Sequence, residues 1–166
     1  MMKARVSAFT LIELLVVIVI IGIMAAMIAP DYLKFRQQID LKNSTSLLQS
    51  GFKEAFSQAR SRSKHYILKK DAGDADHYLV FECDDYLCTT RTAVPNSQGS
   101  GLEHKLEGNT LVMGAAFEIK FFAPHGDMEI IDPAGTTPLT IELDNKGLTT
   151  ALHVYEKSGL VTTDTP

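Results

Sequence analysis

The chain has 166 residues, of which 45% are hydrophobic and 22% charged, a balance that suits one modest globular domain with an appendage. Its formal net charge of −4 argues against nucleic-acid binding, which needs a basic surface to neutralise phosphates. Basic residues do gather between Lys53 and Lys70. We interpret them as the solvated face of a helix and the turn after it, so no nucleic-acid partner is expected.

Residues 1–8 form a short, positively charged segment that ends in a small residue. An apolar run with a single charged residue, Glu13, follows over residues 9–29. As a helix this run would measure about 31 Å at roughly 1.5 Å per residue, which matches a bilayer core of about 30 Å. Because Lys3 and Arg5 precede the run, we expect a single membrane span with a cytoplasmic N-terminus and the rest of the chain outside the cytoplasm.

Three interpretations of this apolar run compete. A secretory signal would have a shorter apolar core followed by a cleavage site, but here Pro30 follows the run directly. A plain membrane anchor fits the length, but it leaves Glu13 unexplained, because a carboxylate inside a bilayer costs about 2.5–3.5 kcal/mol on insertion scales. The third interpretation, cleavage between Ala8 and Phe9, explains both the length of the apolar run and the presence of Glu13. The new α-amino group of Phe9 would neutralise Glu13 of a neighbouring helix and would fix the register of assembly.

Around Glu13 the chain reads AFTLIELLVV (residues 8–17), and this stretch resembles the processing and methylation site of type IV pilins and type II secretion pseudopilins. The resemblance implies that a prepilin peptidase cuts between Ala8 and Phe9 and N-methylates Phe9. It also implies that Glu13 is the assembly carboxylate and that Pro30 ends the first straight segment of the helix. The family usually has glycine before the cut, whereas this chain has Ala8.

The same resemblance implies partners and a location. The partners would be other pilin or pseudopilin subunits, the prepilin peptidase, the inner-membrane assembly machinery and membrane lipid. The chain would first lie in a bacterial inner membrane as a single-pass protein with an extracytoplasmic head. It would then enter a pilus or pseudopilus filament.

After Pro30 the apolar side chains recur at helical spacing. Positions i, i+4, i+7, i+8 and i+11 form one stripe, which consists of Leu48, Phe52, Ala55, Phe56 and Ala59. This pattern predicts an amphipathic continuation of the helix over residues 30–64. The polar run at residues 43–46 is expected to be a weak point where the helix bends or frays.

From residue 65 onward the pattern changes to short segments of β character. The predicted strands are residues 77–83, 116–122, 139–143 and 151–155. Turn signals lie at residues 71–74, 124–127, 132–135 and 145–147. The stretch between Thr92 and Gly108 is polar and rich in small residues, so it is expected to be an exposed loop.

A long helix whose C-terminal half packs against an antiparallel β-sheet domain belongs to the α+β fold class. We therefore expect four segments: a leader peptide (1–8), a transmembrane and assembly helix (9–29), an amphipathic helix (30–64) and a β-rich head (65–166).

Within the pilin family, the head resembles the H-type minor pilin and pseudopilin group. The features that resemble it are Ala59-Arg60 on the helix, the strand and turn at residues 119–126, and the closing Gly159-Leu160-Val161. A major pilin and an unassigned pilin-like protein stay open as alternatives. Some relatives bind DNA through a basic C-terminal tail, but residues 161–166 contain no Lys or Arg, so that role is not expected here.

Cys83 and Cys88 lie close enough in sequence to close a small loop outside the cytoplasm, with free thiols as the alternative. Two thiolates alone make a poor zinc site, because structural zinc takes four ligands. The five histidines are scattered, and the carboxylates at residues 71, 74 and 76 lack the later bidentate Glu of an EF-hand loop. The chain also has no GxSxG, P-loop or GxGxxG motif, so no enzyme, metal or cofactor is expected.

The leading hypothesis is a structural filament subunit, most simply a minor pilin or pseudopilin of a type IV pilus, a type II secretion system or a DNA-uptake machine. The alternative belongs to a different class. It is a membrane-tethered binding module whose extracytoplasmic β domain captures a ligand and never polymerises.

Overall fold

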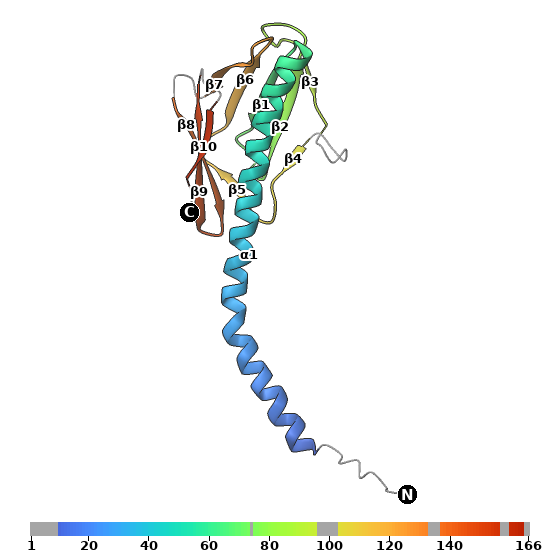
Figure 1. Cartoon of the computed structure of the whole chain (residues 1–166), viewed down its shortest axis with the longest axis vertical. Helices are drawn as coiled ribbons and strands as arrows, with labels where there is room; N and C mark the ends of the chain where they lie inside the picture. Colours follow the sequence, from blue (N-terminus) through green and yellow to red (C-terminus); the bar gives the residue numbers. More distant parts are fainter. Residues whose placement is uncertain (1–9, 74, 96–102, 133–136, 157–159, 165–166) are drawn as a thin grey trace, which may run out of the picture. The chain divides into compact units, whose positions relative to one another are not determined.

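The computed structural model describes residues 10–73, 75–95, 103–132, 137–156 and 160–164 (Figure 1). The described residues form one helix, α1 (Leu11–Arg62), followed by ten strands. The chain divides into two compact units, Met1–Arg36 and Gln37–Pro166, and α1 continues across the boundary between them. The prediction of a long N-terminal helix followed by antiparallel β-structure, an α+β arrangement, is confirmed.

The part of α1 in the first unit is exposed along its whole length, from Leu11 to Arg36. Within the described residues, α1 is the one helix long and apolar enough to cross a membrane, and its most apolar window has a mean hydropathy of 3.0. Pro30 lies inside α1, which continues on both sides of it. The proline ring has no N–H to donate to the carbonyl one turn earlier, so this position lacks one hydrogen bond of the helix ladder.

The strands of the second unit form two antiparallel sheets. Sheet A has the order β3-β2-β1-β6-β7, with β4 also paired to β2, and sheet B has the order β10-β9-β8-β5. The strands are β1 (His65–Lys70), β2 (His77–Cys83), β3 (Arg91–Ala93), β4 (Glu103–Lys105), β5 (Leu111–Met113), β6 (Phe117–Phe122), β7 (Asp127–Asp132), β8 (Leu139–Asn145), β9 (Leu148–Tyr155) and β10 (Leu160–Thr163).

The core lies between the C-terminal part of α1 and the inner faces of the two sheets. Four of the five residues of the predicted helical stripe are buried, and the fifth, Phe56, is half-buried. Phe52 meets Phe121 of β6 edge-on, with ring centroids 6.3 Å apart. Because side chains alternate across a strand, β6 turns Phe121 toward α1 and its neighbours Lys120 and Phe122 toward the opposite face of sheet A.

Gly51 is a point of close approach between α1 and sheet A. Tyr78 of β2 is buried against it and donates a hydrogen bond from Oη to the Leu47 carbonyl at 3.3 Å. A Cβ atom at Gly51 would lie 2.5 Å from Tyr78 Oη, which is shorter than any real contact of this kind. A side chain at this position must therefore displace the tyrosine.

Gly51→Ala is accordingly expected to destabilise the head by about 1–3 kcal/mol through overpacking, partly offset by the roughly 1 kcal/mol that alanine gains over glycine in a helix. Urea unfolding of the detergent-solubilised chain measures the effect. Gly73→Ala is the matched control, because a Cβ added there meets nothing within 4 Å. A Gly51→Ala protein as stable as the control would show that Tyr78 moves aside at no cost.

The polar run at residues 43–46 lies inside the continuous helix α1, so the prediction that the helix frays there is wrong. The reason is a set of contacts with Glu107, in the segment after β4. Ser44 is fully buried; its Oγ accepts a hydrogen bond from the Glu107 N–H at 2.9 Å, and Asn43 Nδ2 donates to the Glu107 carboxylate at 2.8 Å. Thr45 Oγ1 donates to the Leu41 carbonyl at 2.8 Å. The polar side chains therefore attach the helix to the head.

The four predicted strands correspond to β2, β6, β8 and β9, with shifted ends for the last three. The prediction of a single exposed loop between Thr92 and Gly108 is wrong for the described part of that stretch. It contains the end of β3 and all of β4, and Leu106 is buried in the core. Residues 96–102 lie outside the described residues, as do parts of the predicted turns at residues 71–74 and 132–135.

Candidate assembly site

The start of α1 is closed by a reciprocal pair of contacts between Thr10 and Glu13. Thr10 Oγ1 accepts a hydrogen bond from the Glu13 N–H at 3.3 Å, and Glu13 Oε2 accepts one from the Thr10 N–H at 3.5 Å. This arrangement is a capping box, in which two side chains satisfy N–H groups that the first helical turn leaves without partners. It holds the Glu13 carboxylate at the positive end of the helix dipole.

Thr10 is the residue of this site that the sequence analysis missed. The spacing Thr10-x-x-Glu13 directly before an apolar run is a recognised helix-start signature, so the signal was present in the sequence. Ala8 and Phe9, the predicted cleavage and methylation residues, lie outside the described residues. Of the predicted assembly residues, Glu13 stands at the start of α1 and Pro30 within it, and they are not brought together.

The apolar side chains after Glu13 have no partner within the described part of the first unit. Residues 14–29 carry no charge, and the large apolar side chains among them are 45–73% exposed. Such a continuous apolar surface is not stable in water and needs hydrocarbon or other apolar helices around it. The helix can therefore act as a membrane span, as the shaft of a helical bundle, or as both in succession.

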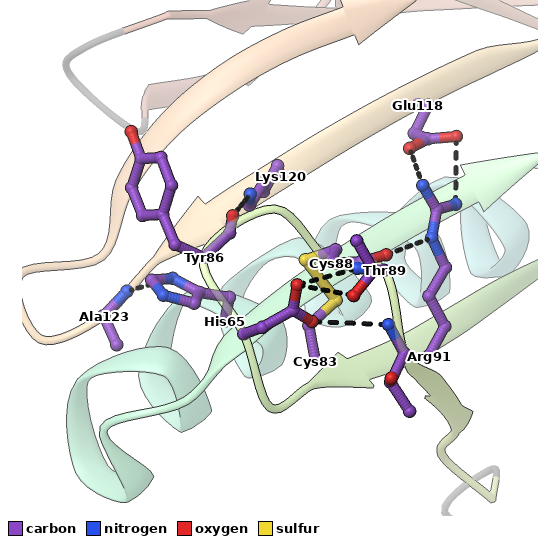
Figure 2. The surroundings of a disulfide bond; sticks show 11 residues. His65, Cys83, Tyr86, Cys88, Thr89, Arg91, Glu118, Lys120 and Ala123 are labelled. Atoms are coloured by element: carbon purple, nitrogen blue, oxygen red, sulfur yellow. Dashed lines mark hydrogen bonds and ion pairs between the residues drawn. A yellow bond between two sulfur atoms is a disulfide. The ribbon is translucent and has the colours of Figure 1, made fainter.

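The second unit presents a separate feature, a short loop closed by a disulfide between Cys83 and Cys88, whose Cα atoms are 5.0 Å apart (Figure 2). Inside this loop, the Asp85 carboxylate accepts hydrogen bonds from Thr89 N–H at 3.0 Å and Thr89 Oγ1 at 2.8 Å, and a third from Thr90 N–H at 3.3 Å. These bonds favour the ionised carboxylate and lower the pKa of Asp85 to about 2.

Two cationic side chains attach this loop to sheet A. Arg91 Nε donates to the Cys88 carbonyl at 3.2 Å, while its guanidinium pairs with Glu118 of β6 at 3.0 Å. Lys120 Nζ donates to the Tyr86 carbonyl and lies 4.8 Å from the centroid of the Tyr86 ring and 4.7 Å from that of Phe122. Burial lowers the pKa of Lys120. The loop is therefore fixed at the carbonyls of Tyr86 and Cys88.

His65 of β1 completes this cluster. Its Nδ1 accepts a hydrogen bond from the Ala123 N–H at 3.1 Å (Figure 2). Its ring meets Tyr86 and Phe122 edge-on, at 5.6 and 5.7 Å between centroids. The pKa of His65 is lowered from its ordinary value of 6.5. Burial is the larger cause and the nearby positive charge of Lys120 is the smaller one. Protonation at Nδ1 would also remove the acceptor that Ala123 needs.

The head is consequently expected to lose stability as the pH falls below 6.5 toward the lowered pKa of His65, because the unfolded chain then binds the proton more readily. Above pH 6.5 this histidine is neutral in both states and its contribution is constant. The half-buried ring of His104 also has its pKa lowered, mainly by burial. Urea unfolding at pH 7.5 and 5.0 measures the loss. His65→Gln should reduce the loss, and an unchanged pH dependence in that variant would contradict this role.

Two of the three carboxylates compared above with an EF-hand loop, Asp71 and Asp76, pair with lysines in the structure. Among the described residues, no group of three or more His, Cys, Asp or Glu side chains is placed to hold a metal ion. Asp71 pairs with Lys69 at 2.7 Å, and Asp76 pairs with Lys105 at 3.3 Å. Asp74 lies outside the described residues.

Comparison with known protein families gives one finding. Residues 3–29 match the family model of the prokaryotic N-terminal methylation motif. No curated protein and no solved structure matches the chain. The match supports a type IV pilin-like or pseudopilin chain at the family level, and proteins with this motif are structural rather than enzymatic. It implies processing by a prepilin peptidase and assembly with other pilin subunits, and it is consistent with membrane anchoring through α1.

Proposed function

We propose that this chain is a structural subunit of a type IV pilus, a type II secretion pseudopilus or a related DNA-uptake filament. The observation on which the proposal rests is Glu13, the single charged residue in the exposed apolar stretch of α1 up to Ala29, which lies within a prepilin methylation motif. A membrane anchor needs the apolar surface, but a carboxylate within it only makes insertion into the bilayer less favourable. In a bundle of helices from several subunits, a carboxylate that pairs with an opposite charge fixes the register of neighbouring helices.

In the proposed mechanism, cleavage between Ala8 and Phe9 creates a new α-amino group that is then methylated. The chain leaves the membrane as its helix joins the bundle, where the amine pairs with Glu13 of a neighbouring subunit. Pairing matters because each charge alone would be costly in an apolar bundle. The capping box with Thr10 holds the Glu13 side chain at the helix start, the end at which the neighbour's amine arrives.

The proposed orientation places the head outside the cytoplasm. Lys3 and Arg5 before the span favour a cytoplasmic N-terminus, and a disulfide such as Cys83–Cys88 persists in extracytoplasmic compartments. As a finer proposal, the subunit is a minor pilin or an H-type pseudopilin. Ala59, buried against the head, and exposed Arg60 provide the helical pair of that group, while β6 followed by the turn at residues 123–126 provides its strand and turn.

Fractionation of sheared filaments tests this function against that of a tethered ligand-binding module. The subunit is expected in the sheared filaments of cells with an active prepilin peptidase, and it should be absent from that fraction when the peptidase is inactivated. A chain found only in the membrane fraction of both strains would favour the tethered module.

A further inference from the structure

The composition of α1 changes after the apolar run that ends at Ala29. Residues 14–29 contain no charged and no aromatic side chain, whereas residues 32–36 read YLKFR. The three apolar side chains of this short segment are 58–60% exposed, and its two bases, Lys34 and Arg36, are exposed as well. We call residues 32–36, which all belong to the first unit, the collar.

Aromatic and basic residues directly beyond an apolar span are typical of the boundary between a membrane and water. A tyrosine there has its ring beside the ends of the acyl chains and its hydroxyl among the headgroups. Lysine and arginine lay their apolar stems along hydrocarbon and extend their charge to the lipid phosphates. The composition of the collar therefore indicates contact with phospholipid headgroups.

The distance from the apolar run places the collar in the headgroup layer. A bilayer has a hydrocarbon core of about 30 Å and a total thickness of about 40–45 Å, so each headgroup layer is about 5–8 Å thick. Tyr32 and Phe35 lie about 4.5 and 9 Å beyond Ala29 along α1, at roughly 1.5 Å per residue. Side chains of a helix tilt toward its N-terminus, which here is the membrane side, so both rings reach back toward the hydrocarbon.

The directions of the two bases favour lipid over a neighbouring helix as the partner. Lys34 and Arg36 are two residues apart, so their side chains point about 160° apart around α1 and cannot both face one partner helix. Leu33 and Phe35 diverge by the same angle. Phospholipids surround a membrane helix on every side, so they can contact all four side chains at once.

We infer that the collar binds phospholipid headgroups at the extracytoplasmic surface of the membrane, with Lys34 and Arg36 on the phosphates and Tyr32 and Phe35 beside the hydrocarbon. The inference rests on the membrane stage of the proposed function and names the chemical group that holds the subunit before assembly. Asp31 directly precedes the collar, so residues 31–36 carry two bases and one acid. This net positive charge favours anionic phosphatidylglycerol over zwitterionic phosphatidylcholine.

Depth-dependent fluorescence quenching tests the position of the collar. Because the chain has no Trp, Tyr32→Trp gives a single fluorescent reporter. The full-length variant is reconstituted into phosphatidylcholine vesicles that carry bromine quenchers either near the headgroup or near the end of the acyl chain. The shallow bromines are expected to quench at least about twofold more strongly than the deep ones. Stronger quenching by the deep bromines, or equal quenching by both, would contradict the placement.

The lipid preference tests the two bases. Brominated phosphatidylglycerol is expected to quench the reporter about twofold more strongly than brominated phosphatidylcholine at equal mole fraction. Lys34→Gln combined with Arg36→Gln should abolish this difference. Lys53→Gln combined with Arg60→Gln is the matched control, because it removes two exposed bases of α1 that belong to the second unit. A neutralised collar that keeps the preference, or a parent protein without one, would contradict the role of the bases.

Photo-crosslinking in cells separates lipid from a neighbouring subunit as the occupant. A photoreactive amino acid replaces Phe35, and the control replaces Ser57, which is also exposed on α1 but belongs to the second unit. In the membrane fraction, the Phe35 variant is expected to give at least about fivefold more phospholipid adducts than the control. Adducts of the Phe35 variant to protein alone would show that another helix covers the collar, and would overturn the inference.

The two proposals fail in different ways. If the subunit stays in the membrane and never enters filaments, the filament function fails, whereas lipid adducts at Phe35 are still expected. If filaments contain the subunit but Phe35 gives no lipid adduct in the membrane fraction, only the inference about the collar fails.

Discussion

Replacing Glu13 with alanine is expected to reduce incorporation of the subunit into filaments by about tenfold or more. The methylated amine of Phe9 would then enter the apolar bundle without a partner. A single charge at the centre of a bilayer costs about 2.5–3.5 kcal/mol on insertion scales, and about 1.4 kcal/mol already corresponds to a tenfold change in an equilibrium. Quantitative immunoblots of sheared filaments, normalised to the processed chain in the membrane, measure the effect.

Two further variants separate charge pairing from helix capping. Glu13→Gln keeps a side chain that can bond to the Thr10 N–H but removes the charge, so it should behave like Glu13→Ala. Thr10→Ala removes the cap, which is worth about 1 kcal/mol, and keeps the charge, so its effect should be milder. Leader cleavage is scored in each variant, so that a loss of assembly is not mistaken for a loss of processing. Glu13→Ala subunits at wild-type levels in filaments would contradict charge pairing.

Phe52→Ala is expected to destabilise the head by about 3–5 kcal/mol, the largest effect that we expect on folding. Phe52 is 2% exposed, packs edge-on against Phe121 and lies where α1 meets sheet A. Truncation would leave a cavity that the helix and sheet cannot close without moving apart. Because the chain has no Trp, near-UV circular dichroism of its tyrosines during urea unfolding of the detergent-solubilised chain is a suitable probe.

Ser57→Ala is the matched control for this variant, since Ser57 lies five residues further along α1 and its side chain is exposed. The control should unfold within about 0.5 kcal/mol of the wild type. If Phe52→Ala were as stable as Ser57→Ala, the C-terminal part of α1 would not be an integral element of the core.

The helix and its buried side could be predicted from the sequence, because Leu48, Phe52, Ala55 and Ala59 recur with the helical period. The arrangement of the strands in two sheets could not be predicted from the sequence. β1 is the strand between β2 and β6, and its three consecutive buried residues, Tyr66–Leu68, give no alternation of apolar and polar side chains. β3, β4 and β5 have three residues each, too few to show any period.

The assembly carboxylate was predictable because the cost of a charge in an apolar run is a local property of the sequence. The capping box was local too and could have been predicted. The cluster around the disulfide loop could not have been predicted in this way. Lys120 of β6 reaches the Tyr86 carbonyl only because β1 pairs with both β2 and β6. Contacts of that kind depend on sheet order, which no short window of sequence contains.

The most direct measurement is the mass of the N-terminal peptide of the subunit purified from cells. If the filament account is correct, the mature chain begins at Phe9 and carries one methyl group on its α-amine. A chain that retains Met1, or one that begins after Ala29, would lack this amine at the start of the apolar helix. Either result would contradict assembly through Glu13.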